Sequence, residues 1–216
     1  MTVKNAGRQP DPRRAQTQAA LIAAAEAALR EMPLEEVTVQ EIARRAGVAV
    51  TSIYNHFGSK AGLQAALAER AMTVDREYMD RAYTAPVSPV EQLQAAAAEY
   101  LKFYRDYPDY FRLLAFPPEQ ARNAASVEMN AQIARRVDEQ NERMVNALRT
   151  GMDAGLIRPA DPRELATALW ASWNGMISLG WRNDSLRRDP ESLRKLIELA
   201  TGVISAGLVL PETRAR

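Results

Sequence analysis

The chain has 216 residues, which is long enough to bury a sizeable core in one domain or in two small ones. Lys and Arg total 28 against 27 Asp and Glu, and a net charge of +1 excludes a protein that coats nucleic acid through its overall field. The lack of cysteine excludes disulfides and thiolate metal sites. No apolar run is long enough to span a membrane and the N-terminus lacks a signal-peptide core, so we expect a cytoplasmic protein.

The first predicted elements are an arm and a helix. Residues 1–11 are polar and have little to bury, so we expect them to be disordered. An aspartate followed by a proline predicts that a helix begins at Pro12, because proline is favoured in the first helical turn. This helix should run to about Met32. Its apolar residues recur at helical spacing, and those expected to face inward are Leu21, Ile22, Ala25 and Leu29.

A helix-turn-helix pattern follows between residues 38 and 60. Thr38 as an N-cap and Glu41 three residues later match a capping box. Gly47 lies just past the expected end of this short helix, where a left-handed backbone is needed. A second short helix is predicted for residues 50–57. Its outer face is small at the N-terminal end, which suits the major groove of DNA, although similar turns between amphipathic helices occur in many helical proteins.

Several positions in this segment match a known family together. The matching runs are Ile42-Ala43, Ala46-Gly47-Val48, Tyr54-Asn55-His56-Phe57, Ser59-Lys60 and Leu63. In identity and spacing they resemble the N-terminal domain of the tetracycline-repressor-like (TetR) family of transcriptional regulators, from about Ala15 to Leu67. Ala49 and Val50 depart from the family pattern, which often has Ser as the cap and then a polar or basic residue. The resemblance implies a homodimer that binds a pseudo-palindromic operator and responds to a small ligand.

The candidate DNA-binding residues lie on and beside the second short helix. Side chains that donate hydrogen bonds suit phosphate oxygens, and those expected to contact phosphates are Thr38, Tyr54, His56 and Lys60. Those expected to face base edges are Gln40, Val50, Thr51 and Asn55, and Ser52 lies beside them. Arg13 and Arg14, at the start of the first helix, either contact the DNA backbone or remain solvated charges.

The rest of the chain also predicts helices. Ser59, and later Ser88-Pro89, Asp161-Pro162 and Asp189-Pro190, are typical helix starts. The expected helices cover residues 60–83, 89–107, 109–116, part of 119–152, 162–181 and 190–208. We therefore predict an all-α protein of about nine helices. Residues 12–60 should form the helix-turn-helix domain, and residues 61–212 a helical domain for ligand binding and dimerisation.

Aromatic and Met side chains are dense in the predicted C-terminal domain. They indicate either ordinary core packing or an apolar ligand cavity with a few polar groups. The resemblance favours a cavity, and its predicted lining is Tyr100, Phe103, Tyr104, Tyr107, Phe111, Met144, Trp170, Trp173 and Asn174. The segment from Trp170 to Leu179 also resembles the Trp-His-Gly segment of one TetR subgroup, with Asn174 in place of the His.

The last two predicted helices carry long apolar stripes with small residues among them. Such stripes belong either to the core of one chain or to a four-helix bundle between two copies, and a reading head of the helix-turn-helix type favours the bundle. The predicted interface residues are Leu165, Leu169, Met176, Leu196, Leu199, Val203 and Ile204.

The sequence offers little to an enzyme. The single histidine, His56, lies inside the helix-turn-helix, so no Ser-His-Asp set and no histidine metal cluster is available elsewhere. We predict no cofactor and no metal. The expected partners are a double-stranded DNA operator, a small-molecule effector and a second copy of the chain, with no membrane. The predicted function is a repressor released by a small apolar or amphipathic ligand. The alternatives are an activator of the same fold and a helical enzyme with an unrecognised site.

Overall fold

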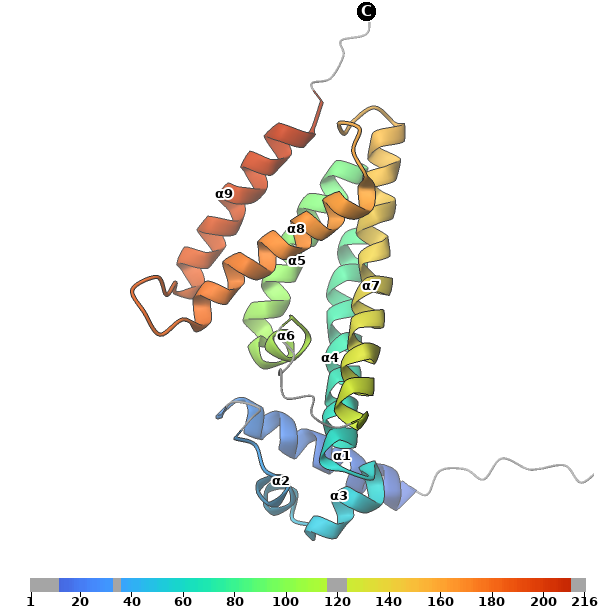
Figure 1. The fold of residues 1–216 in the computed structure, drawn as a ribbon, viewed down its shortest axis with the longest axis vertical. Coiled ribbons are helices and arrows are strands. Elements are labelled where there is room, and N and C mark those ends of the chain that lie inside the picture. Colours follow the sequence, from blue (N-terminus) through green and yellow to red (C-terminus); the bar gives the residue numbers. More distant parts are fainter. Residues whose placement is uncertain (1–11, 33–35, 116–123, 211–216) are drawn as a thin grey trace, which may run out of the picture. The chain divides into compact units, whose positions relative to one another are not determined.

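The computed structural model describes residues 12–32, 36–115 and 124–210, and the predicted N-terminal arm lies outside these residues. The described residues confirm the all-α fold (Figure 1). The helices are α1 (Pro12–Leu29), α2 (Val39–Ala46), α3 (Val50–Phe57), α4 (Lys60–Tyr83), α5 (Pro89–Asp106), α6 (Pro108–Ala115), α7 (Ala124–Asp153), α8 (Pro162–Ser178) and α9 (Pro190–Leu208). A short 3-10 turn (Leu179–Trp181) follows α8, so the eighth α-helix ends earlier than predicted. None of the described helices is both long enough and apolar enough to cross a membrane.

Side-chain caps explain where the helices begin. At α5 the Ser88 hydroxyl accepts a hydrogen bond from the Glu91 amide, and the Glu91 carboxylate accepts one from the Ser88 amide at 2.9 Å. Asp161 and Asp189 are the N-caps of α8 and α9, and each carboxylate accepts hydrogen bonds from two backbone amides of the first turn. At α2 only half of the predicted capping box forms. The Thr38 hydroxyl accepts from the Glu41 amide at 3.2 Å, but the Glu41 carboxylate binds arginines instead.

The chain divides into two compact units. The first comprises residues 1–70 and 118–129, and the second comprises residues 71–117 and 130–216. The division falls within α4 and within α7, so each of these helices contributes residues to both units.

Among the described residues, the first unit is built from α1, α2, α3 and the beginnings of α4 and α7 (Figure 1). Its described core consists of small and branched apolar side chains that are almost fully buried: Leu21, Ala25, Ala28, Val37, Ile42, Ala43, Ile53, Leu63 and Leu67. Gly47 (φ 67°) ends α2 and Gly58 (φ 74°) ends α3. Because residues with a Cβ rarely adopt positive φ, these glycines allow the sharp turns that connect α2 to α3 and α3 to α4.

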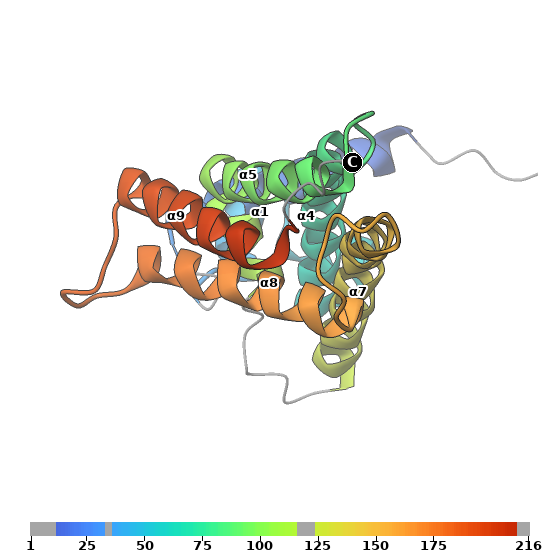
Figure 2. The same cartoon turned by 90° about the horizontal axis from the view of Figure 1, so that it is seen from above.

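The second unit contains α5, α6, α8, α9 and the remaining parts of α4 and α7. Figures 1 and 2 show α4 beside α7, and α5 against α8 and α9. A cluster of buried residues fills the space among these helices: Ala97, Met144, Val145, Leu148, Ile157, Ala166, Leu169 and Trp173. An isolated antiparallel bridge between Ile157 and Val209 ties the residues after α7 to the end of α9.

Candidate nucleic-acid interface and ligand cavity

The turn between α2 and α3 positions a short helix with one buried and one exposed face. The Val48 amide donates to the Ala43 carbonyl at 3.0 Å, which closes the turn after Gly47. Ile53 then anchors α3, with no exposed surface. Since Ile53 faces the core, the opposite face of α3 is presented to solvent, as a recognition helix requires.

The structure brings most of the predicted DNA-binding residues to the surface of the first unit. The exposed ones are Thr38, Gln40, Thr51, Tyr54 and Asn55, whereas Val50, Ser52, His56 and Lys60 are half-buried. Tyr54 is 50% exposed. The hydroxyl of Thr38 accepts the cap hydrogen bond through a lone pair, so its own hydrogen remains available to a phosphate.

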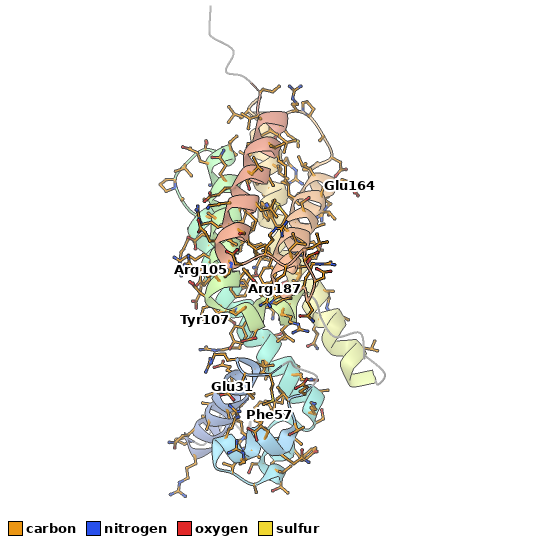
Figure 3. All side chains as sticks on the ribbon, turned by 90° about the vertical axis from the view of Figure 1, so that its left-hand side faces the viewer. Glu31, Phe57, Arg105, Tyr107, Glu164 and Arg187 are labelled. Carbon is orange, nitrogen blue, oxygen red and sulfur yellow. The ribbon has the colours of Figure 1, made fainter. Side chains whose placement is uncertain are left out.

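His56 has a mixed environment. Its Nδ1 atom is buried and has no hydrogen-bond partner among the described residues. Its ring lies 6.4 Å from the ring of Phe57, which is labelled in Figure 3. His56 is therefore partly a packing residue as well as a candidate phosphate ligand.

Two arginines close to this face are already partnered within the first unit. Glu41 accepts hydrogen bonds from Arg44 at 2.8 and 2.6 Å and from Arg45 at 2.6 Å, and Arg45 also reaches Glu31 at 2.5 Å. The Arg44 and Arg45 hydrogen bonds lower the pKa of Glu41 to about 2. At neutral pH the cluster is therefore fully ionised and internally neutralised. Arg14 donates to the backbone oxygen of Asn55 at 3.4 Å, so it links α1 to α3.

The second unit contains a small open cavity among α4, α5, α6, α7 and α8, with a volume of about 40 Å³. The lining residues are Asp75, Met79, Tyr83, Tyr100, Phe103, Phe111, Leu114, Ala115, Val137, Gln140, Asn141, Met144, Trp170 and Trp173. The free space between these side chains admits only a few water molecules. A larger ligand must therefore displace side chains, and the flexible thioethers of Met79 and Met144 suit that adjustment.

The structure brings most of the residues predicted to line a ligand cavity together around this space. Tyr100, Phe103, Phe111, Met144, Trp170 and Trp173 line the cavity. Three predicted residues do not line it. The Tyr104 ring packs edge-on against Trp181, with 5.5 Å between ring centroids. Tyr107 follows α5 (Figure 3), and its side chain is 42% exposed and stacks on Tyr110. Asn174 is buried behind the wall, where it accepts a hydrogen bond from the Tyr100 hydroxyl at 2.8 Å.

The cavity also has a polar wall, on α4 and α7, that was not predicted from the sequence. The Asp75 carboxyl accepts a hydrogen bond from Gln140 through Oδ2, while Oδ1 is buried and has no partner in the described part of the chain. Burial raises the pKa of Asp75 to about 7. The Tyr83 hydroxyl is likewise buried without a described partner, and its burial raises the pKa of Tyr83. One signal was available, because Asp75 interrupts an apolar stripe formed by Met72 and Met79.

The predicted dimer residues differ in their surroundings. Leu199 and Val203 lie one turn apart on α9 and are 66% and 64% exposed. Leu165, Met176, Leu196 and Ile204 are half-buried. Leu169 is only 7% exposed and belongs to the buried cluster of its own chain, so its side chain is not available to a partner. The sequence predicted Leu169 as an interface residue because it continues the apolar stripe of α8 together with Leu165 and Met176.

A helix-turn-helix unit with an exposed recognition helix, in one chain with a helical unit that holds an apolar cavity, defines a one-component transcriptional regulator. Two family models match the chain: the tetR family of bacterial regulatory proteins over residues 21–67, and the tetracyclin repressor-like C-terminal domain over residues 93–203. The chain therefore belongs to the TetR family and is a DNA-binding regulator with a helical ligand-binding domain. No curated protein matches it.

Solved structures of other regulators share this fold. The complex of SmeT, the repressor of a multidrug efflux pump of Stenotrophomonas maltophilia, with triclosan has a TM-score of 0.68 at 23% identity, over 93% of this chain and 98% of that one. The ketosteroid transcriptional regulator KstR2 of Mycobacterium tuberculosis has a TM-score of 0.62 at 20% identity, over 95% and 99%. A transcriptional regulator from Cytophaga hutchinsonii has a TM-score of 0.67 at 16% identity, over 89% and 98%.

Proposed function

We propose that this protein is a repressor that binds a pseudo-palindromic operator as a homodimer and leaves it when a small apolar or amphipathic ligand enters the cavity. The observation that supports DNA reading best is the exposed face of α3. Thr51, Tyr54 and Asn55 are exposed on it, while Ile53 holds the helix to the core. Small polar side chains at the start of a recognition helix let its backbone approach base edges in the major groove.

The contacts divide into two kinds in this proposal. Tyr54, His56, Lys60 and Thr38 bind phosphates and set the position of the unit on the duplex. Gln40, Val50, Thr51 and Asn55 face bases, where the Asn55 amide can pair with adenine and the Thr51 and Val50 methyl groups can contact thymine. Arg44 and Arg45 are not assigned DNA contacts, because both are bound to Glu41.

The homodimer is supported by the surface of the last two helices. Leu199 and Val203 form an exposed apolar ridge on α9, and Gly202 is exposed beside them. The exposed residues of α8 include four small ones, Ala168, Ala171, Ser172 and Gly175. Small side chains let helices from two copies approach closely, and burial of the two large apolar residues favours association. Two copies would supply the two reading heads that a palindromic site needs.

A selection experiment tests the DNA-binding proposal. Duplexes selected from a random library by the wild-type protein should contain an inverted repeat, and fluorescence anisotropy should show that Thr51→Ala and Asn55→Ala alter the preferred bases by about 5- to 100-fold per lost contact. Thr167→Ala on α8, where the threonine is also exposed, serves as the matched control and should preserve both affinity and preference. If Thr51→Ala and Asn55→Ala leave the selected sequence unchanged, α3 does not read bases.

A further inference from the structure

The Asp75 carboxyl is an unsatisfied group that faces the cavity from α4. Its Oδ2 atom accepts a hydrogen bond from the Gln140 side chain, but Oδ1 is buried without a partner in the described part of the chain. A buried carboxyl oxygen without a hydrogen bond is costly, because it has lost its water and gained nothing in exchange. A ligand group that donates a hydrogen bond to Oδ1 would remove this cost.

The charge of Asp75 is also left without a counter-ion inside the cavity. No Lys or Arg lines the cavity in the described structure. The cation that acts on Asp75 is Arg143 on α7, which lowers its pKa less than burial raises it. Arg143 itself forms an ion pair with Asp80. An ionised Asp75 would therefore favour a positive charge in the cavity.

The remaining walls suit a cation with an apolar body. Tyr100 lies 5.0 Å from Phe111 and 6.0 Å from Trp173 between ring centroids, and both contacts are tilted. Phe103 and Trp170 extend the same aromatic lining. Aromatic faces attract cations and also remove apolar surface from water, so this lining complements both parts of an amphiphilic amine.

We propose that the effector carries a protonated amine, whose N–H donates to Asp75 Oδ1 and whose apolar body packs against the aromatic walls. The regulatory role of this ligand rests on the proposed function, but its binding in the cavity does not. Tyr83, whose hydroxyl is also buried without a described partner, offers a second polar contact on the same helix. An anionic ligand would place its charge against Asp75 and is disfavoured.

Three matched probes test this assignment. They are N,N-dimethyl-4-phenylbenzylamine, its uncharged carbon isostere 4-isobutylbiphenyl, and 4-biphenylacetic acid. Binding to the full-length protein is followed by tryptophan fluorescence, since Trp170 and Trp173 line the cavity. The amine should bind about 10- to 100-fold more tightly than the isostere, which is the range for a charge-assisted hydrogen bond. Asp75→Asn should remove this advantage and leave the isostere within about threefold of its wild-type affinity.

The matched control is Glu77→Gln, an equivalent substitution at an exposed position of α4, which should change neither affinity. The wild-type affinity for the amine should also fall about tenfold from about pH 8 to about pH 6, because Asp75 becomes protonated through a pKa of about 7. Tyr83 and Tyr100, which face the same space from α4 and α5, have raised pKa values and stay neutral in this range. Asp75→Asn should abolish the pH dependence.

The inference is overturned if the isostere or the acid binds as tightly as the amine, if Asp75→Asn weakens all three probes alike, or if none of the probes binds. It fails separately from the proposed function. Operator binding without any amine binding would contradict only the proposed amine site at Asp75. Amine binding through Asp75 that leaves operator affinity unchanged would instead uphold the site and contradict release by ligand.

Discussion

The buried carboxyl of Asp75 should destabilise the ligand-free protein at neutral and higher pH, and Asp75→Asn should relieve this cost. Burial raises the pKa of Asp75 from 3.8 to about 7, so the folded state binds the proton more tightly than the unfolded state. The free energy of unfolding should therefore fall as the pH rises from about 4 to about 7, and level off above that range. Below about pH 4 both states are protonated and the cost disappears.

The difference between 3.8 and about 7 corresponds to roughly 4 kcal/mol, at about 1.4 kcal/mol for each pKa unit. Asparagine keeps the shape of the side chain and a hydrogen bond to Gln140 but cannot ionise. We expect Asp75→Asn to be more stable than wild type by about 2 to 4 kcal/mol at pH 8, with little difference at about pH 4.

Urea denaturation followed by far-UV circular dichroism, at a fixed protomer concentration and at several pH values, measures this difference. Glu77→Gln is the control, because that residue is exposed on the same helix. Groups that titrate in both proteins cancel when the two curves are subtracted. If the stability difference between wild type and Asp75→Asn is the same at pH 4 and pH 8, the carboxyl does not ionise in a buried environment and the reasoning is refuted.

Three further predictions concern DNA, assembly and coupling. Lys60→Ala should weaken binding to operator and unrelated DNA alike and lower the magnitude of the slope of log affinity against log salt by about one. Lys195→Ala on α9 should change neither quantity, and a change in sequence preference caused by Lys60→Ala would contradict a phosphate contact. Leu199→Arg should give folded monomers in light scattering, because it places a charge in the proposed interface at a residue that is 66% exposed in one chain. Leu186→Arg, at another exposed leucine, should stay dimeric, and a dimeric Leu199→Arg variant would place the interface elsewhere. Saturating operator should weaken effector binding by the same factor by which the effector weakens operator binding, and an unchanged effector affinity in calorimetry would exclude this coupling.

Helix starts were predictable because their determinants are local. The bounds of α3 and α4 follow from Gly47, Gly58 and Ser59, whose backbone or hydroxyl acts within a few residues; the Ser59 hydroxyl accepts from the Gly62 amide at 3.0 Å. Aromatic members of the cavity were predictable for a different reason. Large apolar side chains are buried in nearly any packing of these helices, so Phe103 and Phe111 had few alternatives.

Two features could not be predicted from the sequence, because they depend on which helices pack together. They are the polar wall of the cavity and the choice of which apolar residues on α8 and α9 are buried. Asp75 reads as a surface residue until α7 is placed against α4, because only then does Gln140 reach its carboxyl. Leu169 and Leu199 carry equivalent apolar signals, yet one lies in the core and the other on the surface. Periodicity specifies that a helix has an apolar face but not which neighbour covers it.

The ion-pair cluster around Glu41 bears on how this protein would search a chromosome. Non-specific binding to DNA strengthens with each lysine or arginine that replaces condensed counterions. Arg44 and Arg45 instead form ion pairs with Glu41 and Glu31 within the protein. We therefore expect short dwell times on unrelated sequence, so that a larger share of the molecules is free to find the operator. A cell could then maintain repression with few copies, since the ratio of specific to non-specific affinity, rather than the affinity itself, decides occupancy.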